Sequence, residues 1–242
     1  QLLDKDAQWQ QLLLGMLGVN LIHACFSYDN PEKIILSLSD NLDQDRFQID
    51  MFSIVGPDFA QVDNRLMSLL LVKNGLSHSA MFGPKGNVLQ ASEALYKKNV
   101  LVLRGRFRPV TNVSVDMMLN GLKVIKEESE MEKSHLLAIT ELALHDLTLA
   151  GEIDEADYLD RVDLLCALGQ TVLISNYREH YKLASYLSNI TQRMKLRIIC
   201  GLGNLKDIFD ESYYENLKGG IIESFAQLFA LNVKIYVYPA LI

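Results

Sequence analysis

Short apolar runs alternate with longer, helix-like segments along most of the chain. In several runs, among them Val100–Leu103 and Thr171–Ser175, apolar residues stand at successive positions, which is typical of strands covered on both faces. The pattern predicts strands at the following positions: Val19–Cys25, Phe47–Val55, Ser79–Phe82, Val100–Leu103, Leu136–Leu144, Thr171–Ser175, Leu196–Gly201 and Val233–Tyr238. Strands that alternate with helices in this way predict an α/β protein with a mostly parallel sheet.

Capping residues mark several of the helices between these strands. Asn30 precedes Pro31, which predicts an N-cap followed by proline in the first helical turn, and Asp154 predicts the start of a helix that ends at Gly169. Further helices are predicted at Phe59–Asn74, Ser92–Lys98, Ser114–Glu128, Arg178–Ile190 and Ile221–Ala230.

Two architectures agree with this pattern. An open, doubly wound sheet of Rossmann-like type is favoured over a closed (βα)8 barrel, because the strands are unevenly spaced and the helix at Ser92–Lys98 is very short. In the open form we expect two lobes, residues 1–98 as an N-terminal α/β lobe and residues 99–242 as a Rossmann-like α/β lobe. The chain begins without Met and ends in an apolar run, so we expect a fragment of a longer polypeptide.

Composition places the chain among ordinary globular proteins. Of its 242 residues, 49% are hydrophobic and 22% are charged, and the net charge is -7, which excludes disordered classes and gives no general attraction to nucleic acid or anionic membranes. No apolar run reaches the roughly 18–20 residues of a membrane helix, and the three cysteines stand in separate apolar runs, so we expect a cytoplasmic protein with buried, reduced thiols. The five histidines lack metal-ligand spacing, so no metal site is expected. The sequence leaves open whether the protein forms a homo-oligomer.

One basic segment stands out in this acidic chain. Residues 95–111 hold five Lys and Arg and no Asp or Glu, and the three arginines among them follow a predicted strand. The carboxyl end of a strand and the start of the next helix form the usual ligand crevice of an α/β sheet, so Arg104, Arg106 and Arg108 are expected to face a phosphate or carboxylate there. Gly105 permits a tight turn, and Thr111, Asn112 or Ser114 is expected to cap a helix whose first amides favour an anion.

Alternation along an extended segment places the three arginines on one side and Phe107 on the other, where it anchors the loop. In the alternative interpretation, Arg104 and Arg106 pair with acidic residues and the segment is structural. The polar residues at 63–65, at the head of a predicted helix, are expected to face the same crevice as the arginines.

The string GRFRPVTNVSVDMM resembles the nucleotidyltransferase signature, in which a strand leads into G-[RS]-F-x-P-x-H-x-G-H. The matching positions are Gly105, Arg106, Phe107 and Pro109. Thr111 and the pair Val113-Ser114 stand where that superfamily has its histidines. The resemblance implies a site for the triphosphate of ATP and adenylyl transfer, with arginine alone to meet the charge on the phosphates.

A longer stretch, from Val62 to Pro239, resembles a family of uncharacterised bacterial proteins. The resemblance rests on runs such as VDNRLMSLLLV, DYLDRVDLLCALGQTVLISNY and IFDESYYENLKGGIIESFAQLFALNVKIYVYP. Members of that family carry automatic labels as nicotinate-nucleotide adenylyltransferase or TonB-dependent receptor. The receptor label implies a membrane barrel, which the α/β pattern contradicts. The resemblance also implies a chain that continues at both ends.

The string LLCALGQTVLISNYREHYKLASYL is similar to the haloacid-dehalogenase-like arrangement, in which a strand ends in Ser/Thr-Asn that grips a phosphoryl group. This similarity implies that role for Ser175 and Asn176. The nucleophilic Asp-x-Asp of that superfamily is absent, since the preceding candidate strand and the residues after it offer only Glu141 and Asp146.

Two classes of function follow from these residues. The first is a protein that binds a nucleotide or another small phosphorylated ligand. In this class the protein could also be an enzyme, with nucleotidyltransferase-type catalysis on ATP or a mononucleotide. The alternative is a non-catalytic ligand-binding or assembly module that retains the fold. Catalytic residues, cofactor and substrate stay unassigned. The predicted binding residues are Arg104, Gly105, Arg106, Arg108, Thr111, Ser114, Ser175 and Asn176.

Overall fold

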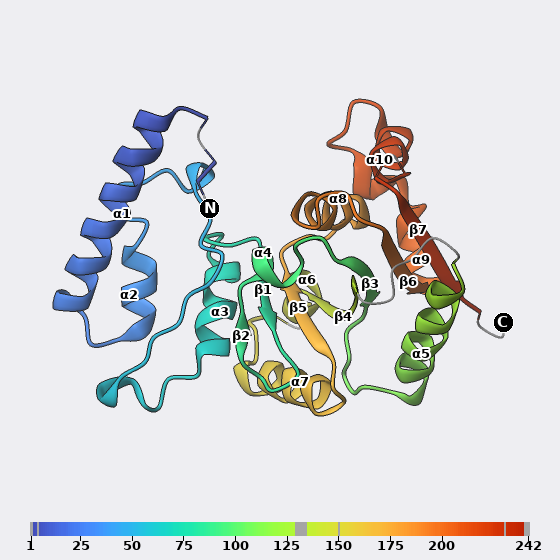
Figure 1. The fold of residues 1–242 in the computed structure, drawn as a ribbon, viewed down its shortest axis with the longest axis horizontal. Coiled ribbons are helices and arrows are strands. Elements are labelled where there is room, and N and C mark those ends of the chain that lie inside the picture. The colour runs from blue at the N-terminus through green and yellow to red at the C-terminus, as the bar shows by residue number, and fades with distance from the viewer. Residues whose placement is uncertain (1, 4, 129–134, 150, 230, 240–242) are drawn as a thin grey trace.

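The structure is a computed structural model that describes residues 2–3, 5–128, 135–149, 151–229 and 231–239. At its centre lies a seven-stranded sheet with the strand order β2-β1-β5-β4-β3-β6-β7 (Figure 1). The strands are β1 (Ser79–Phe82), β2 (Val88–Leu89), β3 (Asn99–Arg104), β4 (Leu136–Ala143), β5 (Thr171–Ser175), β6 (Leu196–Gly201) and β7 (Val233–Tyr238). Strands β3 to β7 run parallel, whereas β1 pairs antiparallel with β5 and β2. The predicted α/β class with a mostly parallel sheet is confirmed.

Side-chain caps begin several helices, as the sequence predicts. The Asn30 side chain accepts hydrogen bonds from the amides of Glu32 and Lys33, and Asp154 caps its helix in the same way. The α-helices of the described residues are α1 (Ala7–Ser27), α2 (Pro31–Ser37), α3 (Asn64–Lys73), α4 (Ala91–Ala94), α5 (Asn112–Glu127), α6 (Leu144–Thr148), α7 (Glu155–Ala167), α8 (His180–Ile190), α9 (Leu202–Ile208) and α10 (Gly220–Phe229).

Helices cover both faces of the sheet. Helices α3, α5 and α7 pack on one face together with Leu101 and Leu103 of β3, and α4, α8 and α10 pack on the other with Val100 and Val102. Successive side chains of a strand point to opposite faces, so burial of both faces explains the continuous apolar runs of the central strands.

The N-terminal helices form a separate layer beside the sheet (Figure 1). Helices α1 and α2 pack with α3 around a group of buried residues that includes Leu13, Ile35 and Phe47. On α3, Leu71 packs into this group and Val72 packs against the sheet. Helix α3 therefore joins the N-terminal layer to the sheet.

The predicted strand at Val19–Cys25 is wrong, because these residues belong to α1. The Asp6 side chain accepts hydrogen bonds from the amides of Gln8 and Trp9 and so begins the helix. Apolar residues on several sides of α1 produce the successive apolar positions that resemble a buried strand.

The predicted strand at Phe47–Val55 is also wrong. Apart from a single bridge between Phe47 and Leu2, this segment is irregular. The Asn64 side chain both donates to and accepts from the backbone of Ile54, and so takes hydrogen bonds that a neighbouring strand would form. Among the described residues, no regular strand precedes Ser79, so the expected N-terminal α/β lobe is helical and irregular up to that point. The sheet itself spans the expected boundary at residues 98 and 99, since β1 and β2 belong to it.

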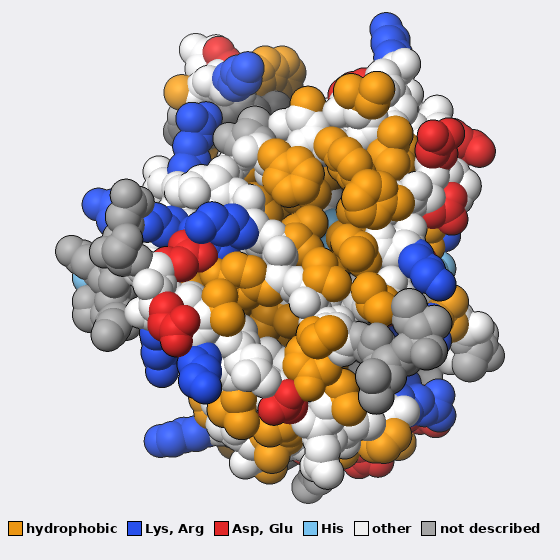
Figure 2. All heavy atoms as spheres, turned by 90° about the vertical axis from the view of Figure 1, so that its right-hand side faces the viewer, with side chains coloured by type: hydrophobic (Ala, Val, Ile, Leu, Met, Phe, Trp, Pro, Cys, Tyr) orange, Lys and Arg blue, Asp and Glu red, His pale blue; other side chains and the backbone are white. Residues whose placement is uncertain are grey.

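The sheet is open, so the alternative of a closed barrel is wrong. Strands β2 and β7 are its outer strands in the described part of the chain. Figure 2 shows the side of the molecule that carries β7, where apolar side chains gather. Exposed apolar residues of α5, α10 and β7 include Leu119, Ile222, Phe229 and Val237. No described helix has the length and apolar character that crossing a membrane requires.

Candidate functional site

The carboxyl ends of β3, β4, β5 and β6 surround a small polar hollow, the carboxyl-end crevice. The chain proceeds from β3 to β4 and β5 on one side, and then places β6 on the other side of β3. The segments that follow β3 and β6 therefore diverge, which opens a hollow between them. The volume of the hollow is about 100 Å³. Its lining residues are Arg104, Gly105, Arg106, Ala143, His145, Asp146, Arg178, Glu179, His180, Asn204, Asp207, Tyr213 and Tyr214.

A buried ion pair joins the strand ends at this crevice. The register of β3 and β4 sets Arg104 beside Glu141, with Arg104 Nε donating to Glu141 Oε2 at 2.6 Å and Nη2 donating to Oε1 at 3.0 Å. Ser175 Oγ, at the end of β5, donates to the same carboxylate at 2.5 Å. Arg104 also donates to the carbonyl oxygens of Tyr177 and Arg178, at 2.6 and 2.8 Å. This network ties three strand ends together.

The pairing corrects the prediction that Arg104 and Ser175 face a ligand. Burial alone lowers the pKa of the Arg104 guanidinium, but the Glu141 carboxylate outweighs that effect and holds the pKa above its usual value. Arg104 is 6% exposed and Glu141 is fully buried, and a charge removed from water in this way needs an opposite charge. Both predicted binding residues are therefore engaged inside the protein.

His180 supplies the crevice with a polar group that is not engaged. It is the first residue of α8, it is 7% exposed, and its Nε2 atom is buried without a hydrogen-bond partner. Burial and the nearby Arg104 charge lower the pKa of the imidazole to about 3, so the ring is neutral near pH 7. No side chain caps the N-terminus of α8. The lining of the crevice therefore includes an imidazole with an unpartnered ring nitrogen, at the first turn of a helix without a side-chain cap.

Two further arginines line the crevice, and their guanidinium groups are less closely paired than that of Arg104. Arg106 is exposed, and its Nε atom lies 3.5 Å from Asp146 Oδ1. The Arg178 guanidinium stacks over the Tyr213 ring at 4.5 Å, and it has no ion-pair partner among the described residues. Stacking occupies the face of a guanidinium and leaves its edge N–H groups able to bind an anion.

Acidic side chains share the same crevice. Lys182 Nζ lies 2.9 Å from Glu179 Oε1 and neutralises that carboxylate, while Asp146 lies 3.5 Å from Arg106 and Asp207 also lines the crevice. The charges of the crevice are therefore close to balance. Recognition of an anion here depends on directed hydrogen bonds rather than on a general positive field.

The basic segment splits at Phe107. This residue is 5% exposed, as the alternation predicts, but its φ of 47° turns the chain out of the extended conformation. Arg161 Nη1 donates to the carbonyl of Arg106 at 3.0 Å and holds the turn in place. Arg108 consequently points to α7, where its Nε atom lies 2.9 Å from Asp157 Oδ1. Arg106 lines the crevice and Arg108 does not, which corrects the prediction of a shared site.

Three other predicted residues also lie outside the crevice. Thr111 caps α5 by accepting a hydrogen bond from the Ser114 amide at 3.2 Å, and Ser114 borders an apolar hollow on the other side of Phe107. The backbone amide of Asn176 donates to the carbonyl of His78 at 2.9 Å. Of the predicted set, Arg104, Gly105 and Arg106 line the crevice.

The sequence reasoning missed most of the lining. His145 and Asp146 follow β4, Arg178 and His180 follow β5, and Asn204 follows β6. Position just after a strand was the signal that could have found them, since carboxyl ends of parallel strands meet at one edge. The histidines were assessed for metal-ligand spacing instead, which these separate positions lack.

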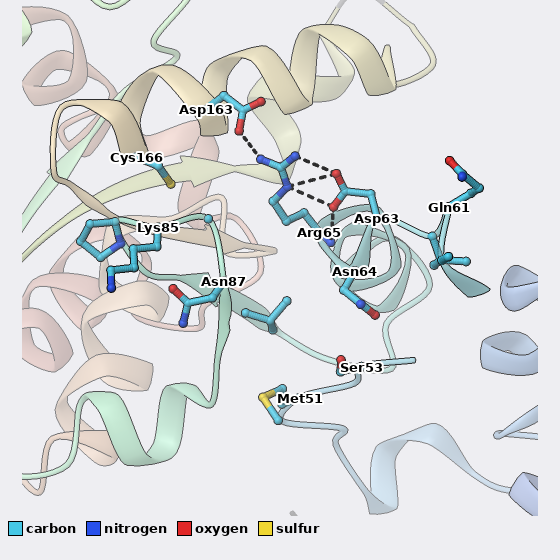
Figure 3. Close-up of a pocket in the computed structure, with 15 residues that line it drawn as sticks. Met51, Ser53, Gln61, Asp63, Asn64, Arg65, Lys85, Asn87, Asp163 and Cys166 are labelled. Atoms are coloured by element: carbon cyan, nitrogen blue, oxygen red, sulfur yellow. Dashed lines mark hydrogen bonds and ion pairs between the residues drawn. The ribbon is translucent and has the colours of Figure 1, made fainter. Parts of the chain in front are cut away.

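A second and larger hollow, the polar groove, lies between the N-terminal layer and the sheet and has a volume of about 920 Å³ (Figure 3). The Arg65 guanidinium lies between Asp63, with an Nη2–Oδ2 distance of 2.7 Å, and Asp163 of α7. Hydrogen bonding to Asp63 raises the pKa of Arg65. The expectation that residues 63–65 face the arginine crevice is wrong, because they line this groove. Among the described residues, no unpartnered buried side-chain N or O atom lines it, so the carboxyl-end crevice is the stronger candidate.

No family model, no curated protein and no solved structure matches the chain. The resemblances seen in the sequence therefore stay predictions, and the site is interpreted from its own geometry. Within the described ranges, no three His, Cys, Asp or Glu side chains are grouped so that they could hold a metal ion.

Proposed function

We propose that this chain binds a small phosphorylated ligand, such as a nucleotide, through a phosphoryl group placed in the carboxyl-end crevice. The order β5-β4-β3-β6-β7 is that of a doubly wound, Rossmann-like sheet, in which ligands bind outside the carboxyl ends where the strand order reverses. The observation that carries the proposal is the buried and unpartnered Nε2 atom of His180 at this position.

The chemistry of the crevice suits a phosphoryl group. A neutral His180 can donate from Nε2 to a phosphoryl oxygen, and the first amides of α8 can donate beside it. Arg106 and Arg178 add charged donors on the open side. A volume of about 100 Å³ accepts a phosphoryl group but is well below the roughly 300–1,000 Å³ of a pocket for a whole drug-sized ligand. The rest of the ligand therefore lies outside the crevice.

We propose binding without adenylyl transfer. Thr111 and Ser114, which stand at the histidine positions of the nucleotidyltransferase signature, lie outside the crevice. Ser175, the predicted phosphoryl grip of the dehalogenase-like arrangement, donates to Glu141 instead. These placements support the non-catalytic ligand-binding module over an enzyme of nucleotidyltransferase type.

Calorimetric titration with inorganic phosphate, AMP and ATP tests the proposal. We expect saturable binding of at least one of them, and we expect Arg106→Ala or Arg178→Ala to weaken it about tenfold or more, as loss of a charged hydrogen bond does. Arg108→Ala is the matched control, since Arg108 belongs to the same basic segment but pairs with Asp157. No heat of binding with any of the three ligands, or equal losses for Arg108→Ala and Arg106→Ala, would overturn the proposal. Release of pyrophosphate from ATP in the presence of nicotinate mononucleotide would instead support an enzyme of nucleotidyltransferase type.

A further inference from the structure

Helix α1 carries no Asp, Glu, Lys or Arg in its 21 residues. One side of it is held by the N-terminal layer, through buried Leu13 and Ala24 and through the Asn20 side chain, which donates to the carbonyls of Leu38 and Asp40. In Figure 1, α1 lies at the outer edge of the molecule, away from the sheet. Its other side is open to solvent.

The open side of α1 has a regular pattern, the α1 seam. Its members recur at alternating spacings of four and three residues: Gln8, Leu12, Gly15, Val19, Ile22 and Phe26. The large apolar members are strongly exposed, with 53% for Leu12, 65% for Val19, 61% for Ile22 and 90% for Phe26. Alternating steps of four and three residues are those of the seam along which two helices pair. This spacing favours a helix as the occupant over a loop or a lipid surface.

We propose that α1 pairs antiparallel with α1 of a second copy of this chain, in a two-fold symmetric dimer. With the symmetry axis on the open side of α1, level with Leu17, the seam is self-complementary. Gly15 of one copy then faces Val19 of the other, and Leu12 faces Ile22. A surface that matches itself in this way is what a two-fold interface requires.

Two glycines of α1 support this pairing. A Cβ atom at Gly15 or at Gly18 would meet nothing within 4 Å in its own chain, and neither residue has a positive φ. Glycine is less favourable than alanine inside a helix, and the fold of the single chain gives no reason for it here. In the antiparallel register, Gly18 faces Gly18 of the second copy beside the axis, where the absence of a side chain lets two helix backbones approach closely.

Charge also favours a second copy as the occupant. The chain has a net charge of -7, which opposes self-association over most of its surface. No charged side chain of α1 itself opposes the meeting of two copies, although Asp40 lines the same hollow as Leu12 and Val19. The positions of α1 that flank the seam, which in mixed coiled coils hold partner-selecting charges, are also uncharged. An antiparallel pair sets the helix dipoles in opposition.

The expected dimer is weak, because a helix of about 31 Å offers less than the roughly 800 Å² per partner of a standard interface. Sedimentation equilibrium of the 242-residue chain should therefore give a monomer–dimer Kd on the order of 1–100 μM. Ile22→Glu should raise this Kd at least tenfold. Ile222→Glu is the matched control, because Ile222 is 77% exposed on α10 and lies outside the seam, and it should leave the Kd unchanged.

Gly18→Ala gives a second test that separates pairing from folding. Alanine should raise the thermal stability of the monomer slightly and, by adding a methyl group at the axis, weaken the dimer. A chain that stays monomeric at 200 μM, or a dimer that Ile222→Glu breaks and Ile22→Glu does not, would overturn the proposal. Circular dichroism of each variant checks that the helices are retained.

Cys25 reports the orientation of the pair. It is exposed, against the expectation of a buried thiol, while Cys166 and Cys200 are buried. In the proposed register Cys25 faces Gln11 of the second copy and lies far from the second Cys25. A short bismaleimide should therefore cross-link dimers of the Gln11→Cys variant, and neither the native chain nor the Gln11→Cys, Cys25→Ser variant. Cross-linking of the native chain would instead show a parallel pair and overturn the antiparallel register.

Discussion

Arg104 and Glu141 face each other at the ends of adjacent parallel strands, with Arg104 Nε 2.6 Å from Glu141 Oε2 and both side chains buried. The pair organises the carboxyl-end crevice, because the same guanidinium also holds the carbonyls of Tyr177 and Arg178 just before α8. It thereby sets the place of His180. An arginine expected to bind the ligand instead positions the residues that can.

Replacing Glu141 by Gln should destabilise the protein by about 3–5 kcal/mol, because the Arg104 charge is then left buried without an opposite charge. Denaturant unfolding at pH 7 measures the change. Ser175→Ala, which removes one hydroxyl donor to the same carboxylate and leaves the ion pair, is the matched control and should cost less, about 1.5–3 kcal/mol. A loss below 1 kcal/mol for Glu141→Gln would contradict the role given to this pair.

The neutral His180 should make the protein sensitive to mild acid. The pKa of His180 is about 3 in the folded state and near 6.5 in the unfolded chain, so between these values the unfolded chain binds one more proton. Stability contributed by this group is complete above pH 6.5 and is lost as the pH falls, by about 1.4 kcal/mol per pH unit.

His180→Gln should remove this dependence. We expect the difference in unfolding free energy between the native chain and the variant to change by about 1.4 kcal/mol from pH 6 to pH 5. His135→Gln provides the control, since His135 is an exposed residue outside the crevice. A difference that stays constant over this range would show that His180 is not held neutral by burial.

A second ion pair should lose its stabilising effect at lower pH than His180 does. Hydrogen bonding from Arg197 lowers the pKa of Glu128 to about 2, and Arg197 itself is buried. The stabilisation is present above the usual glutamate pKa near 4.3 and is lost as the pH falls toward 2. Glu128→Gln should therefore cost about 3 kcal/mol at pH 7 and much less at pH 3.

Lys234→Ala is the control for this pair. Lys234 contacts the same carboxylate at 3.3 Å but is 59% exposed, so its removal should change the unfolding free energy by less than about 1 kcal/mol. If Lys234→Ala and Glu128→Gln lowered the unfolding free energy equally at pH 7, the importance of the buried Arg197 guanidinium would be contradicted.

Most strands could be predicted because both faces of the sheet are covered. The run at Thr171–Ser175 is fully buried, and its continuous apolar residues have one explanation. The run at Val19–Cys25 was wrongly predicted as a strand for the opposite reason. Helix α1 leaves apolar side chains in solvent and so lacks the polar face that marks a surface helix.

The site was predicted only in part, because its decisive contacts join distant segments. The basic segment located the crevice at Arg104–Arg106, but the partner of Arg104 comes from β4 and depends on the strand register. The turn at Phe107 ended the alternation on which the prediction for Arg108 relied. The position of His180 just after β5 could be predicted, but its burial could not, since this results from packing at the start of α8.

The central claim is that a phosphoryl group binds at the buried ring nitrogen of His180. Long-range proton–nitrogen correlation spectra of the imidazoles, recorded during titration with inorganic phosphate and AMP, test it most directly, with the His180 signals assigned from their loss in His180→Gln. We expect the His180 nitrogen shifts to move along a saturable curve with at least one of these ligands, while the imidazoles outside the crevice, those of His23, His78 and His135, stay unchanged. His180 signals that do not move in the folded protein under an excess of both ligands would contradict the account.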